Sequence, residues 1–139
     1  MKRFENQLTG MAGEYLTVGK LFKKGLQAAV TVGNAKAIDI LAYNPGNNKN
    51  YNVQVKTVRR KNAFLIQEKD INQDYIFVFI ILNEFEKNEE YFIIKGSEIL
   101  IDINKFFGLN YRSDAPTGMD GISYGKLKEY KDNWSVFDE

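Results

Sequence analysis

The chain has 139 residues, of which 19 are basic and 18 are acidic, and it contains neither histidine nor cysteine. This length is typical of one domain, residues 1–139, and lets the fold bury roughly two thirds of the surface that the unfolded chain exposes. The missing residue types exclude Ser-His and Cys-His nucleophilic sites and zinc sites with these ligands. Any catalysis must therefore use carboxylates, amides, lysine, hydroxyls and a hard metal ion.

The hydropathy of the chain predicts a soluble, cytoplasmic protein that does not enter a membrane. Its first residues, Met1 to Gln7, lack the apolar region of a signal peptide, and the longest apolar stretch, Ile76 to Leu82, is far shorter than a membrane span. The nearly balanced charge does not by itself indicate a nucleic-acid partner.

The first half of the chain predicts a helix followed by strands. Residues 8–24 have the spacing of an amphipathic helix that ends at Gly25, with an apolar face formed by Leu8, Met11, Ala12, Tyr15, Leu16 and Phe22. Residues 26–32, 37–43 and 51–58 predict three strands in an antiparallel meander. Residues 62–74 are ambiguous and are assigned to a loop with a helical turn.

The second half predicts mixed strands and helices. The continuous apolar run 75–82 indicates a strand buried on both faces, and a second strand, 91–94, follows the acidic hairpin 83–90. Ser97 is expected to cap a short helix that runs to Phe107. After a loop over 111–121, residues 123–133 predict a last helix, with Leu127, Tyr130 and Trp134 on one face.

Three polar side chains in the meander predict a metal-dependent phosphodiesterase site. Gln54 and Lys56 are two residues apart in a strand, so they emerge on the same face. Asp39 lies among aliphatic residues, where an unpaired carboxylate costs several kcal/mol of desolvation. A divalent cation shared with the neighbouring strand would compensate that charge. The simpler interpretation is a polar strand face with an aspartate that pairs with a lysine.

The order of these elements resembles the PD-(D/E)XK nuclease superfamily, and most closely the group I intron-associated homing endonucleases and their freestanding relatives. The matching stretches are Gly13-Glu14 on the helix, residues 37–43, residues 53–57 and residues 130–137. The resemblance implies an α/β, restriction-endonuclease-like fold with a mixed β-sheet flanked by α-helices. It also implies Mg²⁺-dependent hydrolysis of phosphodiester bonds in DNA, with Mn²⁺ as a substitute metal.

The resemblance assigns roles by position. Asp39 corresponds to the metal-binding acid of the family, Gln54 to its second acid, Lys56 to its lysine, and Glu14 to a helix carboxylate found in many members. The metal would be held by Asp39, the Gln54 amide and the Val55 carbonyl. The chain departs from the family motif in two places: Ile38 replaces the proline, and Gln54 brings no charge to the metal.

The partners expected from the same resemblance are DNA and a second copy of the chain. Phosphate contacts are assigned to Lys20, Lys24, Arg59, Arg60 and Lys61. A homodimer or a tetramer of dimers would supply two active centres, and the aromatic residues of Phe106-Phe107 and 134–137 belong either to its interface or to the monomer core. The alternative functions are a catalytically degenerate nucleic-acid-binding or protein-interaction module on the same fold, and a purely structural protein.

Overall fold

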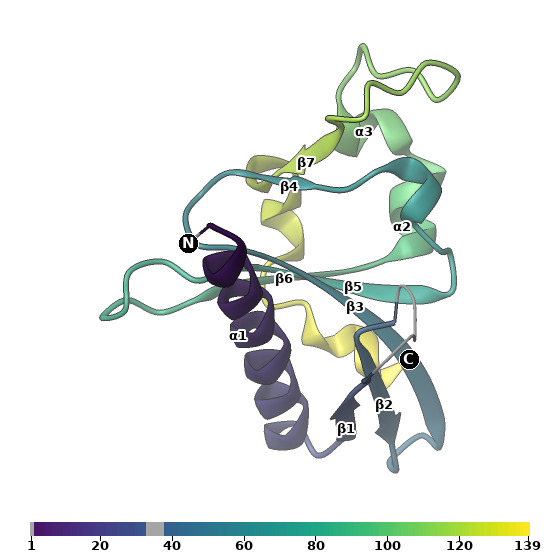
Figure 1. Ribbon diagram of the computed structural model, residues 1–139. Coiled ribbons are helices and arrows are strands. Elements are labelled where there is room, and N and C mark those ends of the chain that lie inside the picture. Colours follow the sequence, from purple (N-terminus) through teal and green to yellow (C-terminus); the bar gives the residue numbers. More distant parts are fainter. Residues whose placement is uncertain (1, 33–37) are drawn as a thin grey trace.

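Helix α1 lies on one face of a five-stranded sheet in the computed structural model, which describes residues 2–32 and 38–139 (Figure 1). The helices are α1 (Lys2–Lys23), α2 (Gly96–Ile101) and α3 (Ile103–Phe107). The strands are β1 (Gln27–Val30), β2 (Ile40–Asn44), β3 (Lys49–Val58), β4 (Ala63–Leu65), β5 (Tyr75–Ile81), β6 (Glu90–Lys95) and β7 (Gly121–Ser123). The 3₁₀ helices are η1 (Glu68–Asp70), η2 (Tyr124–Tyr130) and η3 (Trp134–Asp138). No helix in the described ranges is long and apolar enough to cross a membrane.

The main sheet has the strand order β1-β2-β3-β5-β6. Its first three strands form the predicted antiparallel meander. After a crossover, β5 pairs in parallel with β3, and β6 then pairs antiparallel with β5, so the sheet is mixed. β5 lies between two strands and residues 76–81 are buried, which confirms the strand predicted to be covered on both faces.

Alternate residues of β3 point into two separate cores. Val53 and Val55 pack on the side of the sheet that α1 covers. Gln54 and Lys56 therefore point to the opposite side, where Val58 joins a second core formed with β5 and β6. The two-stranded sheet of β4 and β7 and the helices α2, α3 and η2 cover this second side. The predicted alternation of Gln54 and Lys56 is thus confirmed.

The buried face of α1 is only partly the one predicted, since Leu16 packs against the core and Ala12 is partly buried. Leu8, Met11, Tyr15 and Phe22 are exposed, and the helix instead buries a face of mainly small residues, with Thr9, Gly13, Thr17, Val18 and Leu21. The reason is a close approach to β3: a Cβ atom at Gly13 would lie only 1.8 Å from Thr57 Oγ1. Large side chains do not fit into this contact, so they remain on the outer face.

The end of α1 follows the prediction. Gly25 has a φ of 97°, a conformation that glycine adopts without steric cost. Its N–H donates to Phe22 O, and Leu26 N–H donates to Leu21 O, both at 2.9 Å, which is the Schellman pattern. The chain is thereby turned from the helix into β1.

Several predictions for the second half are wrong in detail. Ser97 makes no capping hydrogen bond, and the helix expected from it to Phe107 is divided into α2 and α3. The last predicted helix is the short strand β7 followed by the 3₁₀ helix η2. Leu127 and Tyr130 lie on η2 and pack in the core opposite α1, whereas Trp134 begins the separate helix η3 and packs in the core beneath α1.

The aromatic segments proposed for a subunit interface belong to the monomer. Phe106, Val136 and Phe137 are buried in the two cores, and Trp134 and Phe107 pack partly against them. Of the two roles open to these segments, the structure selects the monomer core.

Candidate nuclease site

The candidate site lies immediately before the start of β2, where the regular pairing of β2 with β3 stops. Ile40 is the first residue of β2 and lies opposite Val53. One residue earlier, Asp39 N–H donates to Val53 O at 2.9 Å, and Val55 N–H donates to Asp39 Oδ2 at 2.8 Å. The Asp39 carboxylate thus takes the place of the main-chain carbonyl that would otherwise accept from this N–H of β3. This exchange ends the ladder and fixes one oxygen of Asp39.

Thr31 stabilises this junction from the end of β1. In a continued register Val55 would face Ile38, but the Ile38 carbonyl instead accepts a hydrogen bond from Thr31 Oγ1 at 2.6 Å. Thr31 N–H also donates to Asp39 O at 2.9 Å. The threonine therefore leaves the Val55 N–H to the Asp39 carboxylate. Ala37, the first residue of the strand predicted here, lies outside the described residues.

Glu14 approaches Asp39 from α1. It is half-buried, burial raises the pKa of its carboxyl, and the Asp39 carboxylate raises this pKa further. Glu14 follows Gly13 in the helix, so the close contact between Gly13 and Thr57 sets the depth at which Glu14 lies. The structure therefore brings together two of the acidic residues named from the sequence. Within residues 2–32 and 38–139, no group of three acidic side chains is arranged to hold a metal.

Gln54 brings an unpaired oxygen to the same junction. It lies between Val53, whose carbonyl accepts from Asp39 N–H, and Val55, whose N–H donates to Asp39 Oδ2. Gln54 is 7 % exposed, and its Oε1 has no hydrogen-bond donor among the described residues. An unsatisfied buried oxygen costs about 1–3 kcal/mol. An amide oxygen is also a suitable ligand for a hard cation such as Mg²⁺. A metal ion bound at this position would explain why Gln54 Oε1 has no hydrogen-bond donor.

Lys56 lies beside this group on the same face of β3. It lines a cavity of about 370 Å³ together with Asn62, just before β4, and Phe64 and Leu65 of β4. Lys56 forms no ion pair or hydrogen bond with the described residues. Its ammonium group is therefore available to an anion that enters this cavity.

The basic residues assigned to phosphate contacts separate into two places. Arg60 and Lys61 are exposed at the end of β3, next to the candidate site in sequence, and Lys61 Nζ lies 5.8 Å from the ring of Tyr124. Arg59 is bound within the fold, because its Nε donates to Thr9 Oγ1 at 2.8 Å and lies 3.7 Å from Glu5.

Lys20 and Lys24 contact groups away from Asp39. Lys20 Nζ lies 5.2 Å from the ring of Tyr91 on the edge strand β6, and Lys24 forms an ion pair of 2.9 Å with Asp138. Asp39, in contrast, lies at the β1–β2–β3 end of the sheet. The structure does not bring these two lysines to the carboxylates.

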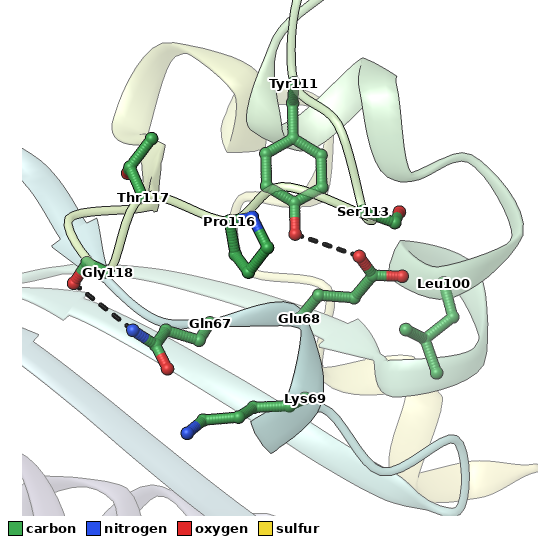
Figure 2. A pocket seen from close by; sticks show the side chains of 9 residues that line it. All are labelled: Gln67, Glu68, Lys69, Leu100, Tyr111, Ser113, Pro116, Thr117 and Gly118. Carbon is green, nitrogen blue, oxygen red and sulfur yellow. Dashed lines mark hydrogen bonds between the residues drawn. The ribbon is translucent and has the colours of Figure 1, made fainter.

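A separate cavity of about 650 Å³ lies between η1 and the loop that contains Tyr111 and Thr117 (Figure 2). Tyr111 Oη donates to Glu68 Oε1 at 2.9 Å, and Gln67 Nε2 donates to Gly118 O at 3.2 Å. Burial and the Glu68 carboxylate raise the pKa of Tyr111 to about 12. These two hydrogen bonds hold the loop against η1 and the residue before it. None of the residues that line this cavity belongs to the candidate nuclease site.

Sequence reasoning missed two residues that position the site. Thr31 gave no signal, because its role depends on the change of hydrogen-bond partners at Asp39, which only the structure reveals. Gly13 did give one: Thr9, Gly13 and Thr17 form a row of small residues with a spacing of four, which indicates a helix face that packs closely.

Two solved structures share this architecture. The bacterial homing endonuclease I-Ssp6803I matches over 95 % of this chain and 91 % of its own, with a TM-score of 0.57 and 14 % identity. Hjc, a Holliday junction resolvase from the archaeal hyperthermophile Archaeoglobus fulgidus, matches over 86 % of this chain and 93 % of its own, with a TM-score of 0.52 and 11 % identity. No protein-family model and no curated protein matches the sequence. At these identities the similarity concerns the fold alone, and it confirms the fold expected from the sequence, a restriction-endonuclease-like mixed sheet flanked by helices.

Proposed function

We propose that this protein is a Mg²⁺-dependent DNA endonuclease that hydrolyses phosphodiester bonds at the Asp39 site. The observation that carries the proposal is the buried Gln54 Oε1, which has no donor among the described residues and lies at the junction where Asp39 is fixed. Asp39, Gln54 and Glu14 together offer the oxygen ligands that Mg²⁺ prefers. The two structural neighbours, an endonuclease and a resolvase, support a nuclease role on this fold.

The ligands would come from both strands and from the helix. Asp39 and Gln54 Oε1 would hold the metal directly. The Val55 carbonyl would join them, because the N–H and C=O of a strand residue face the same neighbouring strand and the Val55 N–H already meets Asp39. Glu14 would complete the set through water. Since Gln54 contributes no charge, we expect weaker metal affinity than a site with a third carboxylate would have.

Lys56 is the residue best placed to act on the phosphate itself. When bound, Mg²⁺ would act as a Lewis acid on the scissile phosphate and make an attacking water more nucleophilic. The Lys56 ammonium would orient that water or offset the negative charge that develops on the phosphorane. Its place in an open cavity without a partner among the described residues suits this task.

DNA would be positioned by its phosphates. Arg60 and Lys61 are the best candidates for this contact, because they are exposed and directly follow the strand that carries Gln54 and Lys56. Arg59 is bound to Thr9, Lys24 is paired with Asp138, and Lys20 lies against Tyr91 away from the two carboxylates, so these three are assigned a structural role here. Phosphate contacts of this kind give affinity and register without reading the sequence.

One observation favours the second candidate, a nucleic-acid-binding module without catalysis. In the described ranges only two carboxylates meet at the site, and the third ligand position carries an amide. Such a module would bind DNA through Arg60 and Lys61 but would leave it intact.

Cleavage and binding measured on the same variants separate the two functions. Wild-type protein is expected to nick or linearise supercoiled plasmid with Mg²⁺, and Asp39→Asn and Lys56→Ala should each reduce the rate at least about a hundredfold while DNA affinity in EDTA stays the same. Asp70→Asn and Lys69→Ala, at exposed positions of η1, are the matched controls and should cleave normally. An Asp39→Asn variant that cleaves at the wild-type rate refutes the site, and a wild type that binds without cleaving favours the binding module.

A further inference from the structure

The outer face of α1 carries an apolar stripe that the monomer does not bury. Phe4, Leu8, Met11, Tyr15 and Phe22 are each between 43 % and 60 % exposed. Their spacing of four, three, four and seven residues is the heptad spacing of a coiled-coil seam. This face is separate from the small-residue face that packs on β3, so α1 has two apolar faces and only one of them is covered within the chain (Figure 1).

The stripe is large enough for a subunit interface. At about 200 Å² for a whole aromatic side chain, the exposed fractions correspond to roughly 500 Å² of surface per chain. Two copies would bury about 1,000 Å² from these side chains alone, which reaches the size of a specific interface before the flanking residues are counted. A patch of this size on a lone monomer is at the upper end of what soluble proteins expose.

The stripe is complementary to a second copy of itself. If two α1 helices run antiparallel about a twofold axis near residue 13, Phe4 lies opposite Phe22 of the other copy and Met11 lies opposite Tyr15. The stripe has one break, at the exposed Gly19, where no atom lies within 4 Å of a Cβ position. The antiparallel arrangement places Leu8 of the other copy over this break and so closes the seam.

A parallel arrangement would be less favourable. It would set the two breaks at Gly19 against each other and leave a void in the seam, and it would align the helix dipoles side by side. In either arrangement the stripe itself carries no charged side chain, so apolar packing decides the choice.

We propose that two copies of this chain form a twofold dimer through antiparallel pairing of the exposed faces of α1. The pairing stands independently of the nuclease function. Because Glu14 is next to Tyr15 in the helix and close to the twofold axis, the dimer also places the two candidate sites on either side of the new interface. Each site remains complete within its own chain.

Sedimentation equilibrium at micromolar protein tests the pairing without any need for activity. The wild type is expected at twice the monomer mass of 16.0 kDa, and Met11→Glu/Tyr15→Glu is expected to raise the dimer dissociation constant at least about a hundredfold and to sediment as a monomer. Leu109→Glu, at an apolar side chain that is 89 % exposed outside α1, is the matched control and should stay dimeric. A monomeric wild type, or a folded Met11→Glu/Tyr15→Glu variant that stays dimeric, overturns the proposal.

Disulfide cross-linking gives a second test that also fixes the orientation. The chain has no cysteine, so Phe4→Cys, Phe22→Cys and the double variant each introduce only the intended thiols. In the antiparallel dimer the same position in two copies is separated by roughly 27 Å, at ~1.5 Å per helical residue, which is too far for a disulfide. The double variant is therefore expected to form a covalent dimer on oxidation, and both single variants should remain monomeric on a denaturing gel. Cross-linking of the single variants would show parallel pairing, and a double variant that never cross-links would exclude this interface.

Discussion

Replacing Gly13 with alanine is expected to destabilise the fold, although alanine is the better helix former. The added Cβ would lie 1.8 Å from Thr57 Oγ1 and 3.0 Å from Thr57 Cβ. β3 cannot move aside easily, because it is paired on both sides, with β2 and β5. Overpacking of this kind costs about 1–3 kcal/mol, and it opposes a gain of up to ~1 kcal/mol in helix propensity.

Gly10→Ala is the matched control for that experiment. It changes the same residue type in the same helix, but no atom lies within 4 Å of its Cβ position, so a gain of roughly 0.5–1 kcal/mol is expected. Urea unfolding followed by the fluorescence of Trp134 should find Gly13→Ala about 1–3 kcal/mol less stable than Gly10→Ala. Adding Thr57→Ala should restore part of the loss. If the two glycine variants are equally stable, α1 does not approach β3 as closely as the structure shows.

Three further predictions follow from hydrogen bonds and burial. Arg59→Ala should lower the unfolding free energy by about 0.5–1.5 kcal/mol in urea titrations, because it removes the bond to Thr9, and an unchanged stability would contradict this role. Burial raises the pKa of Tyr91 from 10.0 to about 12 in the fold, so the stability that its protonated hydroxyl contributes is present below pH 10.0 and is lost as pH rises toward 12. Tyr91→Phe should therefore flatten the fall of stability in alkaline unfolding curves, and an equally steep fall in the variant would contradict this role of Tyr91. Thr31→Val should slow plasmid cleavage by roughly tenfold because it releases the Ile38 carbonyl, whereas Thr31→Ser should not, and equal rates for both would exclude a positioning role.

The sequence was sufficient to predict the meander and the faces of β3. Strand alternation depends only on a period of two, so Gln54 and Lys56 were placed together without knowledge of the rest of the fold. Asp39 was expected inside a strand of residues 37–43 beside Gln54 and Lys56, whereas it lies just before β2, which begins at Ile40. The hydrogen bond from Val55 N–H to Asp39 could not be predicted, because it depends on a change of register at one residue.

The face of α1 was mispredicted for a physical reason. Large apolar residues mark the core-facing side of most amphipathic helices, and Leu8, Met11, Tyr15 and Phe22 were assigned to it on that basis. Here the helix packs through Gly13, where the backbone comes so close to β3 that only small side chains fit. These four residues were therefore placed on the wrong side, whereas Leu16 packs against the core as expected.

The second half was predicted less well because its elements are short. β4 and β7 have three residues each, too few to show an alternating pattern. The segment assigned to the last helix adopts 3₁₀ geometry in η2, whose period of three differs from the 3.6 residues used to align Leu127, Tyr130 and Trp134. The buried positions of Phe106 and Phe137 could not be told from an interface by sequence alone, since large aromatics are common in both.

Binding of Mn²⁺ to the DNA-free protein, measured by calorimetry and by thermal unfolding, tests the central claim most directly, because the account rests on a cation site formed by Asp39, Gln54 and Glu14. The wild type is expected to bind the ion and to gain about 2.7 kcal/mol of stability at a concentration of 100 times the dissociation constant. Asp39→Asn should lose both effects, and the control Asp102→Asn, an exposed position between α2 and α3, should keep them. A wild type that binds no ion, or an Asp39→Asn variant that binds it equally well, would contradict the account.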